Sequence, residues 1–248
     1  MITLGIDLAA QAKNTAACLL DWTSAPVRAI ELQAGLDDDQ LMAFIAQAEK
    51  VGIDSPFGWP TEFVAAVSGY LTGNRWPETT PETLHYRLTD RIVTKLARRP
   101  LSVSTDRIGI TAMRCARLLG RAEEFIGPVD RSGTGRLCEV YPAAALVLWG
   151  FDVRGYKNPR GSVVRARLIE RFLAGATWMV LEEELLEICV RSDHCFDALV
   201  AATIARAAAL ELTQRPSGHE REIARQEGWI HLPSSDSLGR LGPLETGC

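Results

Sequence analysis

The first 54 residues carry the pattern that most restricts the fold of this chain. Apolar residues alternate with other residues across positions 2–8, which is the period of a half-buried β-strand. Residues 15–22 and 26–33 predict two further strands, and the short turns between the three predict a meander. An amphipathic helix is expected at about 37–48, before a short apolar strand at 50–54. A purely parallel Rossmann sheet is thereby excluded, because it alternates strand and helix from its start.

Beyond residue 54 the sequence becomes irregular before helical patterns take over. Residues 55–110 contain five prolines and predict an insertion over one end of the sheet, with helices near 60–72 and 83–98. A fifth strand is expected at 136–141. A tail over 216–248 is predicted to be irregular. The remaining helices are expected at residues 111–125, 142–149, 162–175, 179–190 and 193–212.

Length and composition indicate one mixed α/β domain that spans residues 1–248. The hydrophobic content of 47% is enough for a sizeable core, and a clip at residues 229–233 is expected to pack back on the body. The start of the chain lacks the pattern of a signal peptide, and no apolar run approaches the roughly 20 residues of a membrane span. Six well-separated cysteines indicate reduced, buried thiols rather than structural zinc. We therefore expect a cytoplasmic protein without a membrane partner.

Four acidic residues lie where a solvated charge is not expected. Asp7 and Asp54 end the first and fourth strands, and Glu139 lies within the fifth. Asp197 lies near the start of the last long helix, and the residues three, four, seven and eight positions further on are all apolar. Each acid alone has an ordinary explanation as a turn residue or a salt-bridge partner, and helix capping explains Asp193, which stays only a reserve ligand. Together the four predict a site for Mg²⁺ or Mn²⁺, because buried carboxylates repel one another and a divalent cation relieves that repulsion.

The charge of the chain is unevenly distributed. The net charge is −4, yet residues 87–121 contain nine basic residues and two acids, and so carry a charge of +7. Two sets of basic residues within this segment repeat at three or four positions and would share helix faces. The faces are either ordinary solvated surfaces or a groove that binds phosphates beside the carboxylates. The candidate phosphate-binding residues are Arg87, Arg91, Arg114, Arg117, Arg121 and, outside the segment, Lys157.

Seven short motifs follow one another along the chain: GIDLA, IDSPFGWP, RLTDR, CEVYPAA, GYK, DHCFDALVAA and EGWIHLP. In this order, over about residues 2–233, they resemble the DUF429 family, whose members are described as predicted ribonuclease H-like nucleases. The resemblance implies a five-stranded mixed sheet of order 3-2-1-4-5, flanked by helices, with the insertion between strands four and five. Asp7, Asp54 and Glu139 would then converge at one edge. Residues 194–198 are also similar to the HxxDA helix of RuvC-type junction resolvases, which supplies the last metal ligand.

The first function that these features indicate is a metal-dependent nuclease that hydrolyses nucleic-acid phosphodiesters. Two ions of Mg²⁺ or Mn²⁺ would be held by Asp7, Asp54 and Asp197, with Glu139 as a further ligand or as the base that orients the water. Nucleic acid is the expected substrate, and resolvase-like chemistry would favour a homodimer. The sequence does not choose DNA over RNA, or endonuclease over exonuclease action.

Two other functions stay open. One is a non-catalytic module that binds nucleic acid or a protein and keeps the acids for structural reasons. The other is an actin-like phosphotransferase, which would need glycine-rich phosphate loops that the turn at residues 9–12 lacks. No Walker A loop, GxSxG elbow or HExxH motif is present. Among the histidines, His194 has the position most suited to contact the site.

Overall fold

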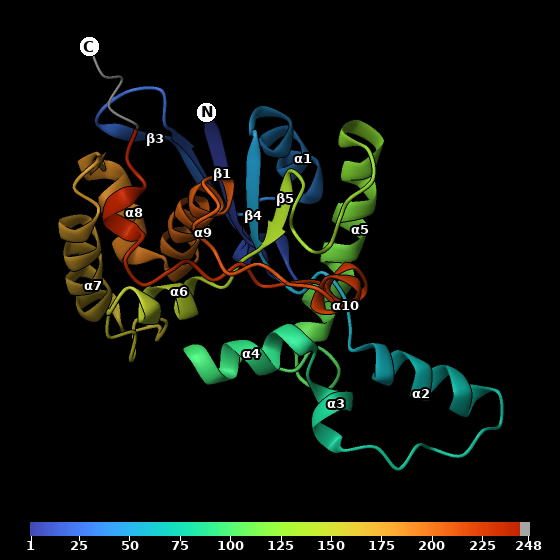
Figure 1. Ribbon diagram of the computed structural model, residues 1–248. Helices are drawn as coiled ribbons and strands as arrows, with labels where there is room; N and C mark the ends of the chain where they lie inside the picture. The colour runs from blue at the N-terminus through green and yellow to red at the C-terminus, as the bar shows by residue number, and fades with distance from the viewer. Residues whose placement is uncertain (244–248) are drawn as a thin grey trace.

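The computed structural model describes residues 1–243, and its centre is one mixed sheet (Figure 1). The sheet order is β5-β4-β1-β2-β3-β6, and β2 alone runs against its neighbours. The predicted opening meander is confirmed. The predicted count of five strands is wrong, because residues 179–180, assigned from sequence to a helix, pair with β3 instead. The strands are β1 Ile2–Asp7, β2 Ala16–Asp21, β3 Val27–Ala34, β4 Lys50–Asp54, β5 Leu137–Glu139 and β6 Met179–Val180.

One face of the sheet is covered by α9, Asp193–Ala209, which packs across β1, β2 and β4 (Figure 1). The helix begins at Ser192, whose hydroxyl accepts a hydrogen bond from the backbone N–H of Cys195 at 3.3 Å. Nearly every residue of α9 is buried, because further helices cover its outer side and close a large apolar core. These are α6 Pro142–Leu148, α7 Ser162–Gly175 and α8 Glu183–Arg191.

The opposite face is covered by α1, Asp38–Gln47, and α5, Ile108–Ile126. A capping box starts α1, in which Asp37 accepts from the N–H of Gln40 and the Gln40 side chain accepts in return. The apolar side chains of α1 and α5 pack against the side chains of β1 and β2 that point to this face of the sheet. The sheet is therefore enclosed between two helical layers, as α/β architectures require.

The insertion between β4 and β5 lies beyond the carboxyl ends of the central strands (Figure 1). It contains α2 Thr61–Leu71, α3 Pro81–His85 and α4 Leu88–Leu96. The single helix expected at 83–98 is interrupted, because the backbone is extended at Tyr86 and at the N-cap Arg87, which enters a buried polar network.

The tail differs in part from its predicted irregular form. It contains α10, Glu220–Glu227, a short helix that packs against α4. The clip at residues 229–233 does pack back, as predicted: the N–H of His231 donates to the carbonyl of Glu139 at 2.8 Å. Two 3-10 turns complete the elements, at Ala12–Asn14 and Leu238–Arg240.

The cysteines that the structure describes lie in its interior. The five within residues 1–243 are buried and free, as expected, and Cys248 lies outside the described residues. Over that same range, no helix has both the length and the apolar character that are needed to cross a membrane.

Candidate metal centre

Two glycines allow α9 to lie directly on the sheet. Gly5 on β1 and Gly52 on β4 are register partners on the face that α9 covers. A Cβ atom on Gly5 would lie 2.0 Å from a carbonyl oxygen of α9, and one on Gly52 would lie 2.7 Å from another. Any larger residue would push the helix away. Two positions further along each strand, on the same face, lie Asp7 and Asp54.

This close packing brings three of the four predicted acids together. Asp7 and Asp54 are register partners at the ends of parallel strands, and Asp197 approaches them from the first turns of α9. One carboxylate oxygen from each residue lies within 4.8 Å of the other two. Asp197 is 1% exposed and Asp7 is 8% exposed, whereas Asp54 is half-buried. Such a set of hard oxygen atoms could bind a metal ion.

Each carboxylate of this group has a different set of partners. The Nδ1 atom of His194 lies 2.6 Å from Asp7 Oδ2. Asp197 accepts a hydrogen bond from the Tyr156 hydroxyl at 2.8 Å, and the Lys157 ammonium lies 2.5 Å from its other oxygen. Within the described residues, no side-chain or backbone donor bonds to the carboxylate of Asp54. Asp54 is therefore the acid whose charge the protein compensates least.

Burial and mutual repulsion govern the ionisation of the group. Burial raises the pKa of Asp54 well above its usual value; the Lys157 ammonium opposes this shift, and the charges of Asp7 and Asp197 add to it. Burial raises the pKa of Asp197 to about 6, again against the effect of Lys157. Burial alone would lower the pKa of Lys157, but the surrounding negative charges outweigh it and raise that pKa well above its usual value. The site thus favours positive charge among its carboxylates.

The loop that carries Tyr156 and Lys157 is held by Arg165 of α7, which sequence reasoning missed. This buried side chain donates to the carbonyl oxygens of Val190 at 2.9 Å, Arg191 at 3.0 Å and Tyr156. A guanidinium with fixed donors suits such a task, because it bridges several backbone carbonyls at once. The sequence signal that could have identified Arg165 is an arginine at a position of the predicted helix that faces the core. The contacts fix where Lys157 meets Asp197.

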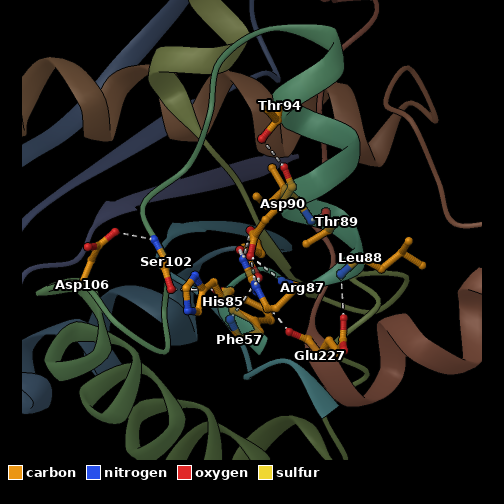
Figure 2. A network of polar contacts seen from close by, with 12 residues as sticks. Phe57, His85, Arg87, Leu88, Thr89, Asp90, Thr94, Ser102, Asp106 and Glu227 are labelled. Atoms are coloured by element: carbon orange, nitrogen blue, oxygen red, sulfur yellow. Dashed lines mark hydrogen bonds and ion pairs between the residues drawn. The ribbon is translucent and has the colours of Figure 1, made fainter. Parts of the chain in front are cut away.

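Glu139 lines the same cavity but belongs to a different network. Its two carboxylate oxygens each accept from Arg87 at 2.7 Å, and one also accepts from the N–H of Phe57 at 3.0 Å. Arg87 also donates to Asp90 at 2.8 and 3.0 Å and to the backbone carbonyl of Glu227 at 3.1 Å; Figure 2 shows Arg87 among these partners. The structure therefore does not bring Glu139 into the carboxylate group. Arg87, 2% exposed and fully engaged, is a structural residue and not the predicted phosphate ligand.

The arginines of α5 also have partners within the fold. Arg114 is buried and donates to Asp38 at 2.7 Å and to two backbone carbonyls. Arg117 pairs with Asp38 and Arg121 with Asp39, each at 2.7 Å. These contacts join α5 to α1. The expected phosphate groove is therefore not a free face of α5, because folding neutralises much of its charge.

A cavity of about 340 Å³ opens beside the carboxylates. It is lined by Asp7, Asp54 and Lys157, and also by Arg98 and Arg99, which sequence reasoning did not single out. The signal that could have identified this pair is two adjacent arginines before Pro100, within the basic segment 87–121 and just after the end of α4.

Two other predicted residues lie outside the group. Arg91, on α4, is half-buried and does not line the cavity. Asp193 occupies the first turn of α9, where Ser192 provides the cap, and its carboxylate is not in the three-residue group. Asp193 is thus neither the cap that we expected nor a member of the group.

Comparison with known proteins identifies one family. Residues 5–222 match the family described as Protein of unknown function (DUF429). No curated protein and no solved structure matches the chain. The matched region contains the three clustered carboxylates, the loop of Lys157 and the whole insertion, and stops before the clip at residues 229–233. The chain therefore belongs to the DUF429 family.

Proposed function

We propose that the protein is a divalent-metal-dependent nuclease that hydrolyses phosphodiester bonds. The observation that carries the proposal is the group of Asp7, Asp54 and Asp197, whose oxygen atoms lie within 4.8 Å of one another at the end of two parallel strands. The run β3-β2-β1-β4-β5 within the sheet agrees with a ribonuclease H-like fold and supports the same interpretation. A bound divalent ion would supply Lewis-acid stabilisation of the charge that develops on the phosphate.

The residues present fit Mg²⁺ or Mn²⁺. The group offers only carboxylate oxygens, which these hard cations prefer, and Asp54 has an uncompensated carboxylate that faces the cavity. Three carboxylates suffice for one ion. A second ion of a two-ion mechanism would take its remaining ligands from the substrate, because Glu139 is bound by Arg87.

The chain's own residues would orient the substrate and handle protons. Lys157 and the guanidinium groups of Arg98 and Arg99 surround the cavity with positive charge that attracts a phosphate. The hydrogen bond to Asp7 raises the pKa of His194, and the side chain is 38% exposed. We infer that His194 holds a proton next to the reacting phosphate and exchanges it with solvent.

A nuclease assay with a matched pair of variants tests this proposal. Labelled single-stranded and duplex DNA and RNA are incubated with the purified protein in Mg²⁺, Mn²⁺ or EDTA. We expect cleavage that needs the metal and that is lost in Asp54→Asn. Asp39→Asn, which removes an exposed acid of α1 paired with Arg121, should keep full activity. The absence of metal-dependent cleavage of every substrate, or its survival in Asp54→Asn, would overturn the proposal.

A second candidate, a non-catalytic binding module, is favoured by one specific observation. Lys157 and His194 already direct positive charge at Asp197 and Asp7, so the group is partly compensated without a metal. In the same assay such a module would bind nucleic acid without cleaving it, and binding would be indifferent to EDTA.

A further inference from the structure

The cavity beside the carboxylates is small and has walls of mixed character. Its volume of about 340 Å³ is at the lower end of the roughly 300–1,000 Å³ of small-molecule sites. Asp7, Asp54 and Lys157 lie on one side. The remaining lining residues are largely apolar and include Leu8, Ile108 and the aromatic side chain of Tyr141. A pocket with a charged floor and an apolar wall suits a phosphate joined to one sugar and base.

The roof of the cavity is anchored to the body of the protein. It consists of the segment between α4 and α5, residues 97–107. Ser102, 1% exposed, donates from its hydroxyl to the carbonyl of His85 at 2.7 Å, and its N–H donates to Asp106 at 2.8 Å (Figure 2). Val103 is also buried. These contacts fix the segment, whose residues 98–101 line the cavity beside the carboxylates.

The rim of the cavity carries two arginines that differ from the others of the basic segment. All three of Arg87, Arg98 and Arg99 line the cavity, but Arg98 and Arg99 are exposed, whereas Arg87 is buried and paired with Glu139. The guanidinium of Arg99 lies 4.6 Å from the centre of the Tyr86 ring, which orients it without neutralising its charge. Arg98 lines the same cavity as Tyr141. A phosphate entering the cavity would pass between these two charges.

We propose that the cavity admits one nucleotide unit, so that the substrate is a single-stranded end or a small nucleotide diester and not the interior of a duplex. The proposal rests on the proposed nuclease function for its chemistry. A duplex keeps its bases stacked and paired, whereas a free end presents an unstacked nucleotide. In the cleavage step water gives up a proton as its oxygen bonds to phosphorus, the ester P–O bond breaks, and the departing oxygen takes up a proton.

The first test compares the cleavage of substrates with and without a free strand end. The probes are a linear single-stranded 20-mer, the same strand ligated into a circle, a closed circular duplex, and the p-nitrophenyl ester of thymidine 5′-monophosphate, each with Mn²⁺. We expect cleavage of the linear strand and the ester, with the circle and the closed duplex cut at least tenfold more slowly. Equal rates for the circle or the closed duplex would overturn the single-nucleotide cavity and leave the nuclease function supported.

Nucleotide binding provides the second test and separates the two proposals. Thymidine monophosphate affinity is measured with Mn²⁺ for the wild type, for Arg98→Ala combined with Arg99→Ala, and for Lys95→Ala. Removal of both guanidinium groups should weaken binding about tenfold or more. Lys95→Ala removes an exposed charge of α4 outside the cavity and should not weaken it. Arginine-dependent binding without cleavage of any probe would support the cavity and reject the nuclease; binding unchanged in the double variant would reject the cavity.

Discussion

At the scale of single residues, the carboxylates of the site are unequal. Asp7 has His194 as a partner, and Asp197 has a tyrosine and a lysine, but no described residue donates to Asp54. Desolvation disfavours the charged form of a carboxylate that accepts no hydrogen bond, and with the negative charges of Asp7 and Asp197 it raises the pKa of Asp54. Asp54 is therefore the residue at which removal of charge should have the clearest thermodynamic effect.

Asp54→Asn should stabilise the metal-free protein and remove its response to metal. In EDTA at pH 8 we expect a gain of about 1–2 kcal/mol, a rise of several degrees in Tm, because asparagine fills the same space without the repelled charge. The gain should shrink as pH falls, since a carboxyl with a raised pKa becomes protonated in the folded state. Mn²⁺ should raise the Tm of the wild type but not of the variant. Equal shifts with Mn²⁺, measured by thermal unfolding, would place the metal elsewhere.

His231 should make stability depend on pH. Burial lowers its pKa to about 4, although the hydrogen bond to the Ser132 carbonyl at 3.0 Å opposes this shift. The other ring nitrogen lies 2.9 Å from the Thr213 hydroxyl. A histidine with a depressed folded pKa binds its proton first in the unfolded state, so the free energy of unfolding falls as pH drops from about 6.5 to 4. The slope is at most about 1.4 kcal/mol per pH unit. His231→Gln should flatten it in urea titrations at several pH values, and an unchanged slope would refute this role.

The sequence predicted some site residues better than others, for physical reasons. Asp7, Asp54 and Asp197 obey local rules, since a strand end and a helix face are set by neighbours a few positions away. Glu139 also has a strand position, but its state depends on Arg87, which lies 52 positions earlier in the chain. The periodicity of a sequence does not predict an ion pair between residues so far apart. The ion pair could be found only once the insertion had been placed in space.

At the scale of elements, the glycine pair of β1 and β4 sets the distance between α9 and the sheet. Gly5→Ala would place a Cβ 2.0 Å from a carbonyl oxygen of α9 and force helix and sheet apart. We expect a loss of about 2–3 kcal/mol in urea unfolding, in the range of overpacked cores, together with loss of metal binding. Gly120→Ala is the matched control, because nothing lies within 4 Å of its added Cβ. In the interior of α5 it should stabilise by about 0.5–1 kcal/mol. Similar effects of both changes would contradict the role of Gly5.

The buried arginine between α3 and α4 joins three elements. Arg87 connects Asp90 of α4, Glu139 of β5 and the end of α10. Arg87→Met leaves two buried carboxylates without their counter-charge, and should cost about 3–5 kcal/mol in denaturant unfolding. Adding Glu139→Gln should recover part of this loss, since one of the unpaired charges is then gone. Arg117→Met, at an exposed ion pair, should change stability by less than about 1 kcal/mol. Equal costs for the two arginines would show that Arg87 is not a structural clamp.

Elements with a strong local pattern were predicted well, and those set by tertiary contacts were not. The three-strand meander has a clear period of two, and α9 is a long apolar stretch rich in alanine, which favours a helix. The predicted helix at 83–98 breaks where Arg87 turns inward, and the predicted helix at 179–190 loses its first residues to pairing with β3. The short α10 lies in a tail that the sequence predicts to be irregular. In each case contacts far along the chain outweigh local propensity.

At the scale of the whole molecule, ion pairs formed on folding neutralise much of the positive charge of the basic segment. The segment 87–121 has a charge of +7 in a chain of net charge −4. Arg114 and Arg117 share one acid of α1 and Arg121 pairs with another, so this surface is largely neutral. Within the described residues, the exposed positive charge next to the carboxylates lies at the cavity rim. A chain of this kind should hold a polyanion through few contacts rather than along a broad basic face.

The salt dependence of binding distinguishes a rim of two arginines from a broad groove. Each phosphate contact to a single strand contributes a slope of about −0.7 to log K against log salt concentration. Contacts from Arg98 and Arg99 alone predict a slope of about −1.4, whereas a groove built from the six basic residues first expected would give about −4. Anisotropy of a labelled single strand, measured in EDTA so that no cleavage occurs, supplies the slope. Arg98→Ala with Arg99→Ala should flatten it, while Arg117→Ala should leave it unchanged because Asp38 already neutralises that charge. A slope near −4 whose magnitude decreases in Arg117→Ala would contradict this prediction. It would mean that the arginines of α5 leave their acidic partners on α1 and bind the nucleic acid instead.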